Sequence, residues 1–399
     1  MSLGLISRNG DLRRLRDEGY EVDVVNGYLL IGHVPYVNAN KQVAYGILVS
    51  HLDLAGDSTV RPSSHVAFWV GDYPCNSNGL QLGSLVNDPN VHERIRDGLE
   101  ATLSFSQKPA EGYEDYYQKM TAYVRILEGY AHLLEVNATA QTFPVIPLTE
   151  EESVFCYLDS ASSRAGITAI NEKLKKGRIA IVGLGGTGAY ILDLVAKTLV
   201  GEIYLFDGDT FLQHNAFRSP GAPSCDALKK KLTKVEWFAE NYSRIRRKII
   251  PHPQYIDKTN VDELKSMDFV FLCLDKGEPK RNIVDYLIEN KIPFIDVGMG
   301  LNIQDGALGG LVRVTTCTPS FHDHFTSRIP FDDGEDNEYS RNIQVAEMNA
   351  LNAALAVIKW KKIWGFYIDL ENEHHTVYGI STNLLTNEEA QNETKADQT

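Results

Sequence analysis

The chain has 399 residues, of which 43% are hydrophobic and 23% charged, as in an ordinary globular protein long enough for two domains with separate cores. Its formal net charge of −14 argues against a general nucleic-acid or anionic-membrane surface, because phosphate binding needs a high density of basic residues. No apolar run approaches the roughly 20 residues of a membrane span. The N-terminus also lacks a signal-peptide core, so we expect a cytoplasmic protein.

The first 145 residues predict a small α+β domain. Short β-prone runs occur between residues 20 and 75, and Asn26-Gly27 between two of them is a strong hairpin signal. Residues 91–105 and 113–135 have the apolar spacing of helices. Two prolines within residues 142–149 end the helical pattern. We therefore place a domain boundary there, after a first domain at 1–145.

From residue 150 onward, β-prone runs alternate with helical ones. The expected strands are 179–182, 203–206, 248–255, 269–272 and 294–297. This alternation predicts an α/β domain at 150–385 with a mostly parallel sheet covered on both faces. The polar composition of residues 386–399 predicts a disordered tail.

The most informative stretch begins at the expected strand 179–182. Four glycines follow that strand, at Gly183, Gly185, Gly186 and Gly188. The order strand, glycine-rich turn and helix places backbone N–H groups against a phosphate, with no side chain in the way. The next strand ends in Asp207, at the distance where an acidic residue meets a ribose hydroxyl. The pattern predicts an adenine-nucleotide site.

Further polar residues follow in a recognisable order. They are Asp207, Asp209, Asn215 and Arg218, then Lys234 at the start of a helical run, and Asp275 at the end of an apolar strand. This series resembles the ThiF/MoeB superfamily, which includes the ubiquitin-activating enzymes. The resemblance covers about residues 155–380 and implies a Rossmann-like adenylation domain.

The resemblance implies ATP- and Mg²⁺-dependent adenylation of the C-terminal carboxylate of a ubiquitin-like protein. A carboxylate that attacks the α-phosphorus must overcome charge repulsion, so catalysis depends on positioning and on neutralising phosphate charge. Arg218 and Lys234 would supply cations, and Asn215 would supply an amide near the phosphates. Asp275 would ligate Mg²⁺, and Asp207 would hold the ribose. Arg164 precedes the glycine loop as an arginine does in relatives, where it reaches the ATP of the opposite subunit, which implies a homodimer.

The acyl acceptor is where the chain departs from the pattern. Relatives that transfer the acyl group to sulfur use a cysteine in the crossover region, and here residues 316–342 hold only Cys317. A thiolate is the better nucleophile near neutral pH, which makes Cys317 the first choice. The alternatives are a hydroxyl of Ser320, Thr326 or Ser327 with His322 or His324 as base, or an enzyme that only adenylates and passes the acyl-adenylate directly on. The five cysteines are scattered without a Cys-x-x-Cys pair, so we expect no zinc.

Two other classes of function stay open at the level of sequence. An NAD-dependent oxidoreductase would use the same glycine loop and Asp207, but would leave Arg218, Lys234 and Asp275 unexplained. A catalytically silent protein could act as a scaffold for a conjugation complex. The N-terminal domain is expected to recognise the ubiquitin-like substrate or a conjugating-enzyme-like carrier. Its Cys75 follows a strand, as a conjugating cysteine would, although a structural strand and turn explains it as well.

Overall fold

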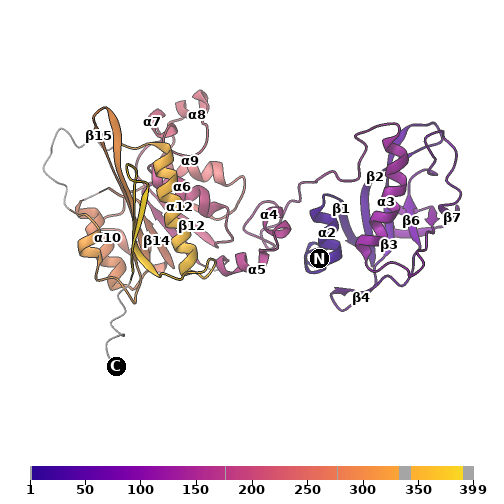
Figure 1. Ribbon diagram of the computed structural model, residues 1–399, viewed down its shortest axis with the longest axis horizontal. Coiled ribbons are helices and arrows are strands. Elements are labelled where there is room, and N and C mark those ends of the chain that lie inside the picture. The colour runs from indigo at the N-terminus through magenta and orange to yellow at the C-terminus, as the bar shows by residue number, and fades with distance from the viewer. Residues whose placement is uncertain (1, 176, 276, 332–342, 390–399) are drawn as a thin grey trace. The chain divides into compact units, whose positions relative to one another are not determined.

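The computed structural model describes residues 2–175, 177–275, 277–331 and 343–389 (Figure 1). The chain forms two compact units that separate between Ile146 and Pro147, called here the N-terminal and C-terminal units. Each unit has its own hydrophobic clusters of buried residues. Among the described residues, no helix combines the length and hydropathy that a membrane span requires.

The N-terminal unit is built on an antiparallel sheet with the strand order β1-β2-β3-β6-β10-β7. Its helices are α1 (Ser2–Arg8), α2 (Gly10–Asp17) and α3 (Tyr116–His132). Its strands are β1 (Glu21–Val25), β2 (Tyr28–Val37), β3 (Val43–His51), β4 (Leu54–Ala55), β5 (Ser58–Thr59), β6 (Ala67–Val70), β7 (Val86–Asp88), β8 (Glu93–Arg96), β9 (Leu99–Ala101) and β10 (Leu103–Phe105). The predicted hairpin turn joins β1 to β2, and Asn26 and Gly27 both have positive φ, at 49° and 80°.

The prediction of a helix at 91–105 is wrong, because these residues form β8, β9 and β10. Asp97 and Gly98 separate β8 from β9, and Gly98 has φ +75°, a left-handed conformation that a glycine adopts without strain. Ile95 and Ala101 are buried while Arg94, Arg96 and Glu100 on either side are exposed, which is the alternation of strands.

The C-terminal unit contains an eight-stranded sheet with the order β13-β12-β11-β14-β15-β16-β17-β18. Its strands are β11 (Arg178–Val182), β12 (Glu202–Phe206), β13 (Ile249–His252), β14 (Phe269–Leu272), β15 (Phe294–Gln304), β16 (Ala307–Cys317), β17 (Glu373–Gly379) and β18 (Leu384–Glu389). Its helices are α4 (Ser160–Arg164), α5 (Thr168–Asn171), η1 (Glu172–Leu174), α6 (Gly186–Ala196), α7 (Gln213–Ala216), α8 (Cys225–Lys229), α9 (Lys234–Tyr242), η2 (Val261–Ser266), α10 (Glu278–Glu289), α11 (Phe325–Arg328) and α12 (Ala346–Ile363). The five strands from β13 to β15 pair in parallel, which confirms the predicted Rossmann-like sheet.

The other end of the sheet is antiparallel and was not predicted. β15 extends to Gln304, seven residues beyond the expected strand end, and pairs along its whole length with β16. β17 and β18 continue the sheet from there. β18 includes residues 386–389, where the composition predicted a disordered tail; the remaining residues of that tail, 390–399, lie outside the described residues.

Alternate residues of the central strands face two different layers of helices. Ile179 and Ile181 of β11 belong to the hydrophobic cluster formed with α6, α9 and α12. Ala180 and Val182 belong to the cluster formed with η2 and α10. The sheet is therefore buried on both faces, as a parallel sheet requires, and its carboxyl edge carries the segments after β11, β12 and β14, which contain most of the predicted site residues.

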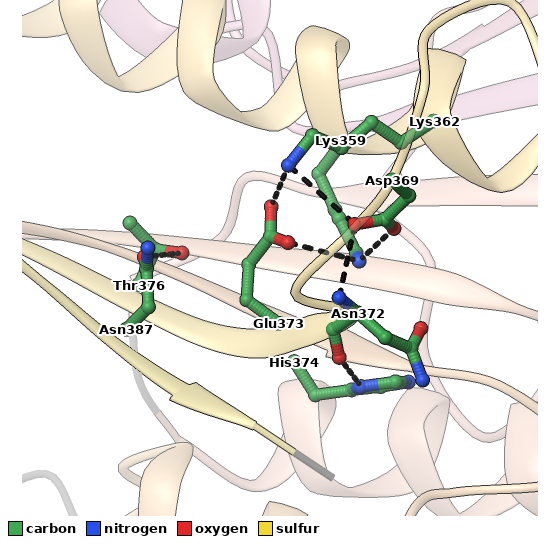
Figure 2. Close-up of polar contacts among 8 residues, drawn as sticks. All are labelled: Lys359, Lys362, Asp369, Asn372, Glu373, His374, Thr376 and Asn387. Atoms are coloured by element: carbon green, nitrogen blue, oxygen red, sulfur yellow. Dashed lines mark hydrogen bonds and ion pairs between the residues drawn. The ribbon is translucent and has the colours of Figure 1, made fainter.

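The C-terminal end of α12 is joined to β17 and the loop before it by a cluster of ion pairs (Figure 2). Lys359 Nζ lies 2.9 Å from Asp369 Oδ2, and Lys362 Nζ lies 2.7 Å from Glu373 Oε1. The Lys359 side chain is only 5% exposed, so its partners must offset the cost of burying its charge. These contacts attach the last part of the sheet to the helix that packs on α6.

Candidate active site

The glycine loop joins β11 to α6 and leaves very little space for side chains at most of its glycines. Gly183 has φ +91°, and a Cβ added there would lie 2.6 Å from the carbonyl oxygen of Cys273. A Cβ at Gly188 would lie 2.0 Å from the carbonyl oxygen of Gly183. Gly185 differs, because among the described residues no atom beyond its own neighbours in the chain lies within 4 Å of the position its Cβ would take. The loop thus leaves open space immediately before the first turn of α6, where N–H groups lack intrahelical partners and can bind a phosphate.

Asp207 fixes this loop. Its Oδ2 accepts a hydrogen bond from the backbone N–H of Leu184 at 2.7 Å, and its Oδ1 accepts one from Asp209 N–H at 2.8 Å. Lys234 Nζ lies 3.2 Å from the same Oδ2. Both carboxylate oxygens are therefore engaged by the chain itself, and Asp207 is only 6% exposed. This arrangement favours a role in shaping the loop over the predicted contact with a ribose.

Asp209 also lies at this edge of the sheet and faces solvent, with its side chain 50% exposed. Lys234 Nζ lies 2.5 Å from its Oδ2, and this hydrogen bond is the main reason why the pKa of Asp209 is lowered. The hydroxyl of Tyr255 donates to its Oδ1. That bond raises the pKa of Tyr255 to about 12. The ring of Tyr255 leaves no room for a side chain at Gly208, since a Cβ there would lie 2.7 Å from it. The sequence analysis did not single out Tyr255.

Asn215 and Arg218 lie in the segment that follows β12. Asn215 is buried, and its Oδ1 accepts from the N–H of Leu212 at 2.8 Å, so its amide stabilises the start of α7. Arg218 has a buried Nε for which the described residues supply no hydrogen-bond partner. Its charge also contributes to the lowered pKa of Asp209. A buried guanidinium nitrogen without a partner fits a site that receives an anion.

Asn349 of α12 joins Arg218 to the glycine loop. It is fully buried, its Oδ1 accepts from the hydroxyl of Thr187 at 2.8 Å, and its Nδ2 donates to the carbonyl of Arg218 at 3.3 Å. The side chain of Asn349 thus connects the backbone of Arg218 directly to the first turn of α6. The sequence analysis missed this residue, because it lies about 130 positions away from Arg218 and belongs to no motif.

Asp275 follows β14 at the same carboxyl edge, and its side chain is exposed. The backbone there is held by Lys280, whose Nζ donates to the carbonyls of Asp275 at 3.1 Å and Leu274 at 3.4 Å. Within the described ranges, no group of three or more His, Cys, Asp or Glu side chains could hold a metal ion. A single exposed carboxylate suits Mg²⁺, which usually takes one or two carboxylates together with phosphate oxygens.

Cys317 does not lie where a nucleophile would. It is 1% exposed at the end of β16, in the hydrophobic cluster under α10, and burial raises its pKa to about 12. Such a thiol is almost never ionised near neutral pH, so the structure does not support the prediction that it accepts an acyl group. Cys75 of the N-terminal unit is also 1% exposed, with its pKa raised by burial.

The other predicted residues lie at the surface. The hydroxyl alternatives, Ser320, Thr326 and Ser327, are all exposed. In the part of the chain that the structure describes, no hydrogen bond joins one of these hydroxyls to the ring of His322 or His324. Arg164, at the end of α4, is exposed as well. The structure thus brings together Arg218, Lys234, Asp207 and Asp209, whereas Arg164 and the possible acyl acceptors are not joined to them by any contact described.

Comparison with known proteins gives the class of this fold and site. Residues 161–395 match the ThiF family, and residues 10–160 match a domain of unknown function (DUF6791). The chain therefore belongs to the ThiF family, with an additional N-terminal domain.

Curated relatives match only part of the chain. The tRNA threonylcarbamoyladenosine dehydratase of Escherichia coli is 28% identical over 126 residues, which are 30% of this chain and 45% of the relative. The ubiquitin-like modifier-activating enzyme 5 of Drosophila mojavensis is 25% identical over 161 residues, 37% of this chain and 39% of the relative. The chain thus spans less than half the length of these curated relatives.

Solved structures of MccB from E. coli are similar as well. The complex with ATP is 20% identical, covers 55% of this chain and 65% of MccB, and has a TM-score of 0.43. A structure of the microcin C7 biosynthetic enzyme MccB in complex with N-formylated MccA is 20% identical, covers 58% of this chain and 70% of that chain, and has a TM-score of 0.45.

Proposed function

We propose that the C-terminal unit binds ATP with Mg²⁺ and adenylates the C-terminal carboxylate of a ubiquitin-like protein. The observation that carries this proposal is the placement of Arg218. Its Nε is buried without a partner among the described residues, and its backbone is tied by Asn349 to the first turn of α6. The backbone of Arg218 is thus connected through one side chain to the first turn of α6, and an arginine close to a helix N-terminus would favour a polyanionic ligand.

The site fits ATP in two further respects. Gly185 leaves open space in front of α6, where a phosphate can approach the backbone. Lys234 and Asp209 form an ion pair at the same edge of the sheet. Both oxygens of Asp209 already accept a hydrogen bond, from Lys234 and from Tyr255, but its side chain is 50% exposed, so lone pairs remain open to ribose hydroxyls, unlike those of the buried Asp207. ATP would supply the α-phosphorus that the carboxylate attacks, with pyrophosphate as the leaving group.

In this proposal the residues of the chain act mainly by positioning and by charge. Arg218 donates hydrogen bonds to phosphate oxygens, and Lys234 supplies a second positive charge beside them. Asp275 would provide one oxygen ligand to Mg²⁺. Asp207 keeps the loop in shape through Leu184. None of these side chains needs to gain or lose a proton, which agrees with a phosphoryl site built for electrostatic stabilisation.

The alternative of an NAD-dependent oxidoreductase is less well supported. Such an enzyme would present the carboxylate of Asp207 to the ribose, and here both oxygens of that carboxylate are engaged by the backbone N–H groups of Leu184 and Asp209. It would also give no role to Arg218. A scaffold without catalysis would not need a buried arginine nitrogen for which the described residues supply no partner.

The substrate and the assembly are parts of the same proposal. A ubiquitin-like protein is suggested by the ThiF family and by the ubiquitin-like modifier-activating enzymes among the relatives. We propose a homodimer in which Arg164 reaches the nucleotide of the partner subunit, and an N-terminal unit that recognises the ubiquitin-like protein or its next carrier. The exposed position of Arg164 at the end of α4 leaves it available for such a contact.

ATP–pyrophosphate exchange with candidate ubiquitin-like proteins tests the proposal. We expect exchange that requires Mg²⁺ and a partner with a free C-terminal carboxylate. Arg218→Ala should cost about 2–4 kcal/mol in transition-state stabilisation, the typical loss of one donor to developing charge. Asp275→Ala should abolish exchange while the fold stays intact, because Asp275 is exposed and lies outside the hydrophobic clusters of the unit.

Arg178→Ala is the matched control. Arg178 is the first residue of β11, at the opposite edge of the sheet. It forms an ion pair with Glu202, in which Nε lies 3.3 Å from Oε2. Exchange should continue at close to the wild-type rate in this variant. If Arg218→Ala behaves like Arg178→Ala, Arg218 is a surface arginine and the proposed phosphate site is wrong.

A further inference from the structure

A buried amide on α12 lies where three segments of the nucleotide site meet. Asn349 is 0% exposed, and the other buried residues of its helix include Met348, Asn352 and Ala353. Burying a primary amide in apolar surroundings is unfavourable unless its polar atoms are hydrogen-bonded. The amide of Asn349 makes its two bonds to Thr187, in the first turn of α6, and to the carbonyl of Arg218.

Gly186 provides a second, independent observation. A Cβ at Gly186 would lie 2.0 Å from Nδ2 of Asn349, so the amide fills the space that any larger residue would need. The sequence analysis assigned Gly186 to phosphate binding. In the structure the first residue of α6 is a glycine because Asn349 packs directly on it, which brings α12 against the glycine loop.

Arg218 needs such support, because it lies in an irregular segment between α7 and α8. Its N–H donates to the carbonyl of Asn215 at 3.2 Å, and its carbonyl accepts from Asn349 at 3.3 Å. These two bonds hold its backbone from both sides. A guanidinium can stabilise charge only if its orientation is fixed before the reaction.

We propose that Asn349 is a positioning residue, which fixes Arg218 relative to the glycine loop and thereby sets the affinity of the site for ATP. The inference rests on the proposed function. It gives α12 a role that none of the sequence motifs indicates. It also predicts that substitutions at Asn349 and Arg218 have coupled effects on ATP affinity.

Asn352 offers a matched control. It lies three residues further along α12, is also 0% exposed, and donates from Nδ2 to a backbone carbonyl, that of Gly298 in β15, at 3.0 Å. Asn349→Leu and Asn352→Leu each remove one buried amide from the same helix, so a general loss of packing or stability should affect both. Only Asn349 contacts Arg218 and the glycine loop.

The experiment measures ATP affinity of the full chain by titration calorimetry with Mg²⁺, together with thermal unfolding of each variant. Asn349→Leu should weaken ATP binding about tenfold, the effect of one lost hydrogen bond on a ligand-binding group. Asn352→Leu should stay within about twofold of the wild type. In the double variant with Arg218→Ala, Asn349→Leu should add almost nothing, because the group that it positions is gone.

Three results would overturn the inference. Equal loss of ATP affinity in the two leucine variants would show a general structural effect. Fully additive losses with Arg218→Ala would show that Asn349 does not act through Arg218. If Asn349→Leu does not fold, Thr187→Val removes one of the two bonds with little change in volume, and unchanged ATP affinity in that variant would count against the proposal. Failure of the wild-type chain to bind ATP would instead refute the proposed function itself.

Discussion

A buried group of three charges beside Asp275 allows a quantitative prediction. Asp296 in β15 is 0% exposed, and its two oxygens lie 2.6 Å from Lys280 Nζ and 2.6 Å from an Arg313 nitrogen. Asp296→Asn would leave two cations without an anion between them. Removing one partner of a buried ion pair typically costs about 3–5 kcal/mol, and we expect a loss of that size in the free energy of unfolding.

Lys280→Met should cost much less. It leaves the pair of Asp296 and Arg313 intact and keeps the apolar stem of the side chain, so we expect a loss of about 1–2 kcal/mol. The variant also removes the bonds to the carbonyls of Leu274 and Asp275, so the Mg²⁺ concentration required for exchange should rise.

Urea denaturation followed by tryptophan fluorescence measures both losses. Three of the four tryptophans, Trp237, Trp360 and Trp364, lie in the C-terminal unit. An unchanged slope of the free energy of unfolding against urea concentration would show that the unfolded state is the same in both variants. The reasoning would be refuted if Lys280→Met cost as much as Asp296→Asn, because the order of the two losses follows directly from the charges left behind.

Three further outcomes are expected. Mixing an Arg164→Ala chain with an Asp275→Ala chain should restore activity in one site of the heterodimer; a mixture that stays inactive while heterodimers form would mean that Arg164 does not act across subunits. Cys317→Ala should leave exchange and any ATP-dependent covalent adduct unchanged, since the thiol is buried; loss of a thiol-labile adduct in this variant would instead support Cys317 as the acyl acceptor. Burial lowers the pKa of His375 to about 4 from an ordinary 6.5, so the unfolded chain takes up the proton first as pH falls. Stability should therefore drop from pH 6.5 toward 4, by about 1.4 kcal/mol per pH unit, and His375→Gln should flatten this dependence.

Local signals predicted much of the fold. The Asn26-Gly27 turn depends only on the backbone freedom of two adjacent residues, and the strands around the glycine loop are short apolar runs rich in β-branched and aromatic residues, which favour strands. The prediction of a helix at 91–105 was wrong. Ile95 and Leu99 are four residues apart, which is a helical spacing, but the turn at Gly98 outweighs that spacing. The Asp305-Gly306 turn between β15 and β16 is a signal of the same kind that was not used in the prediction.

The candidate site was predictable only in part. Asp207 and Lys234 were expected at one place and do form an ion pair, although the roles of the two carboxylates follow from their partners and not from their order in the chain. Asn349 and Tyr255 could not be found, because each reaches the site from a distant segment. Their contribution depends on packing between elements, which spacing along the sequence does not encode.

The connectivity of the sheet has a consequence for how the chain folds. β15 and β16 are joined by a two-residue turn at Asp305 and Gly306, so they can pair quickly and without help from the rest of the unit. The central pair of β11 and β14 joins residues about ninety positions apart, and closing so long a loop is slow. Because the glycine loop and Asp275 follow those two strands, we expect the nucleotide site to be completed late, after the antiparallel edge of the sheet has formed.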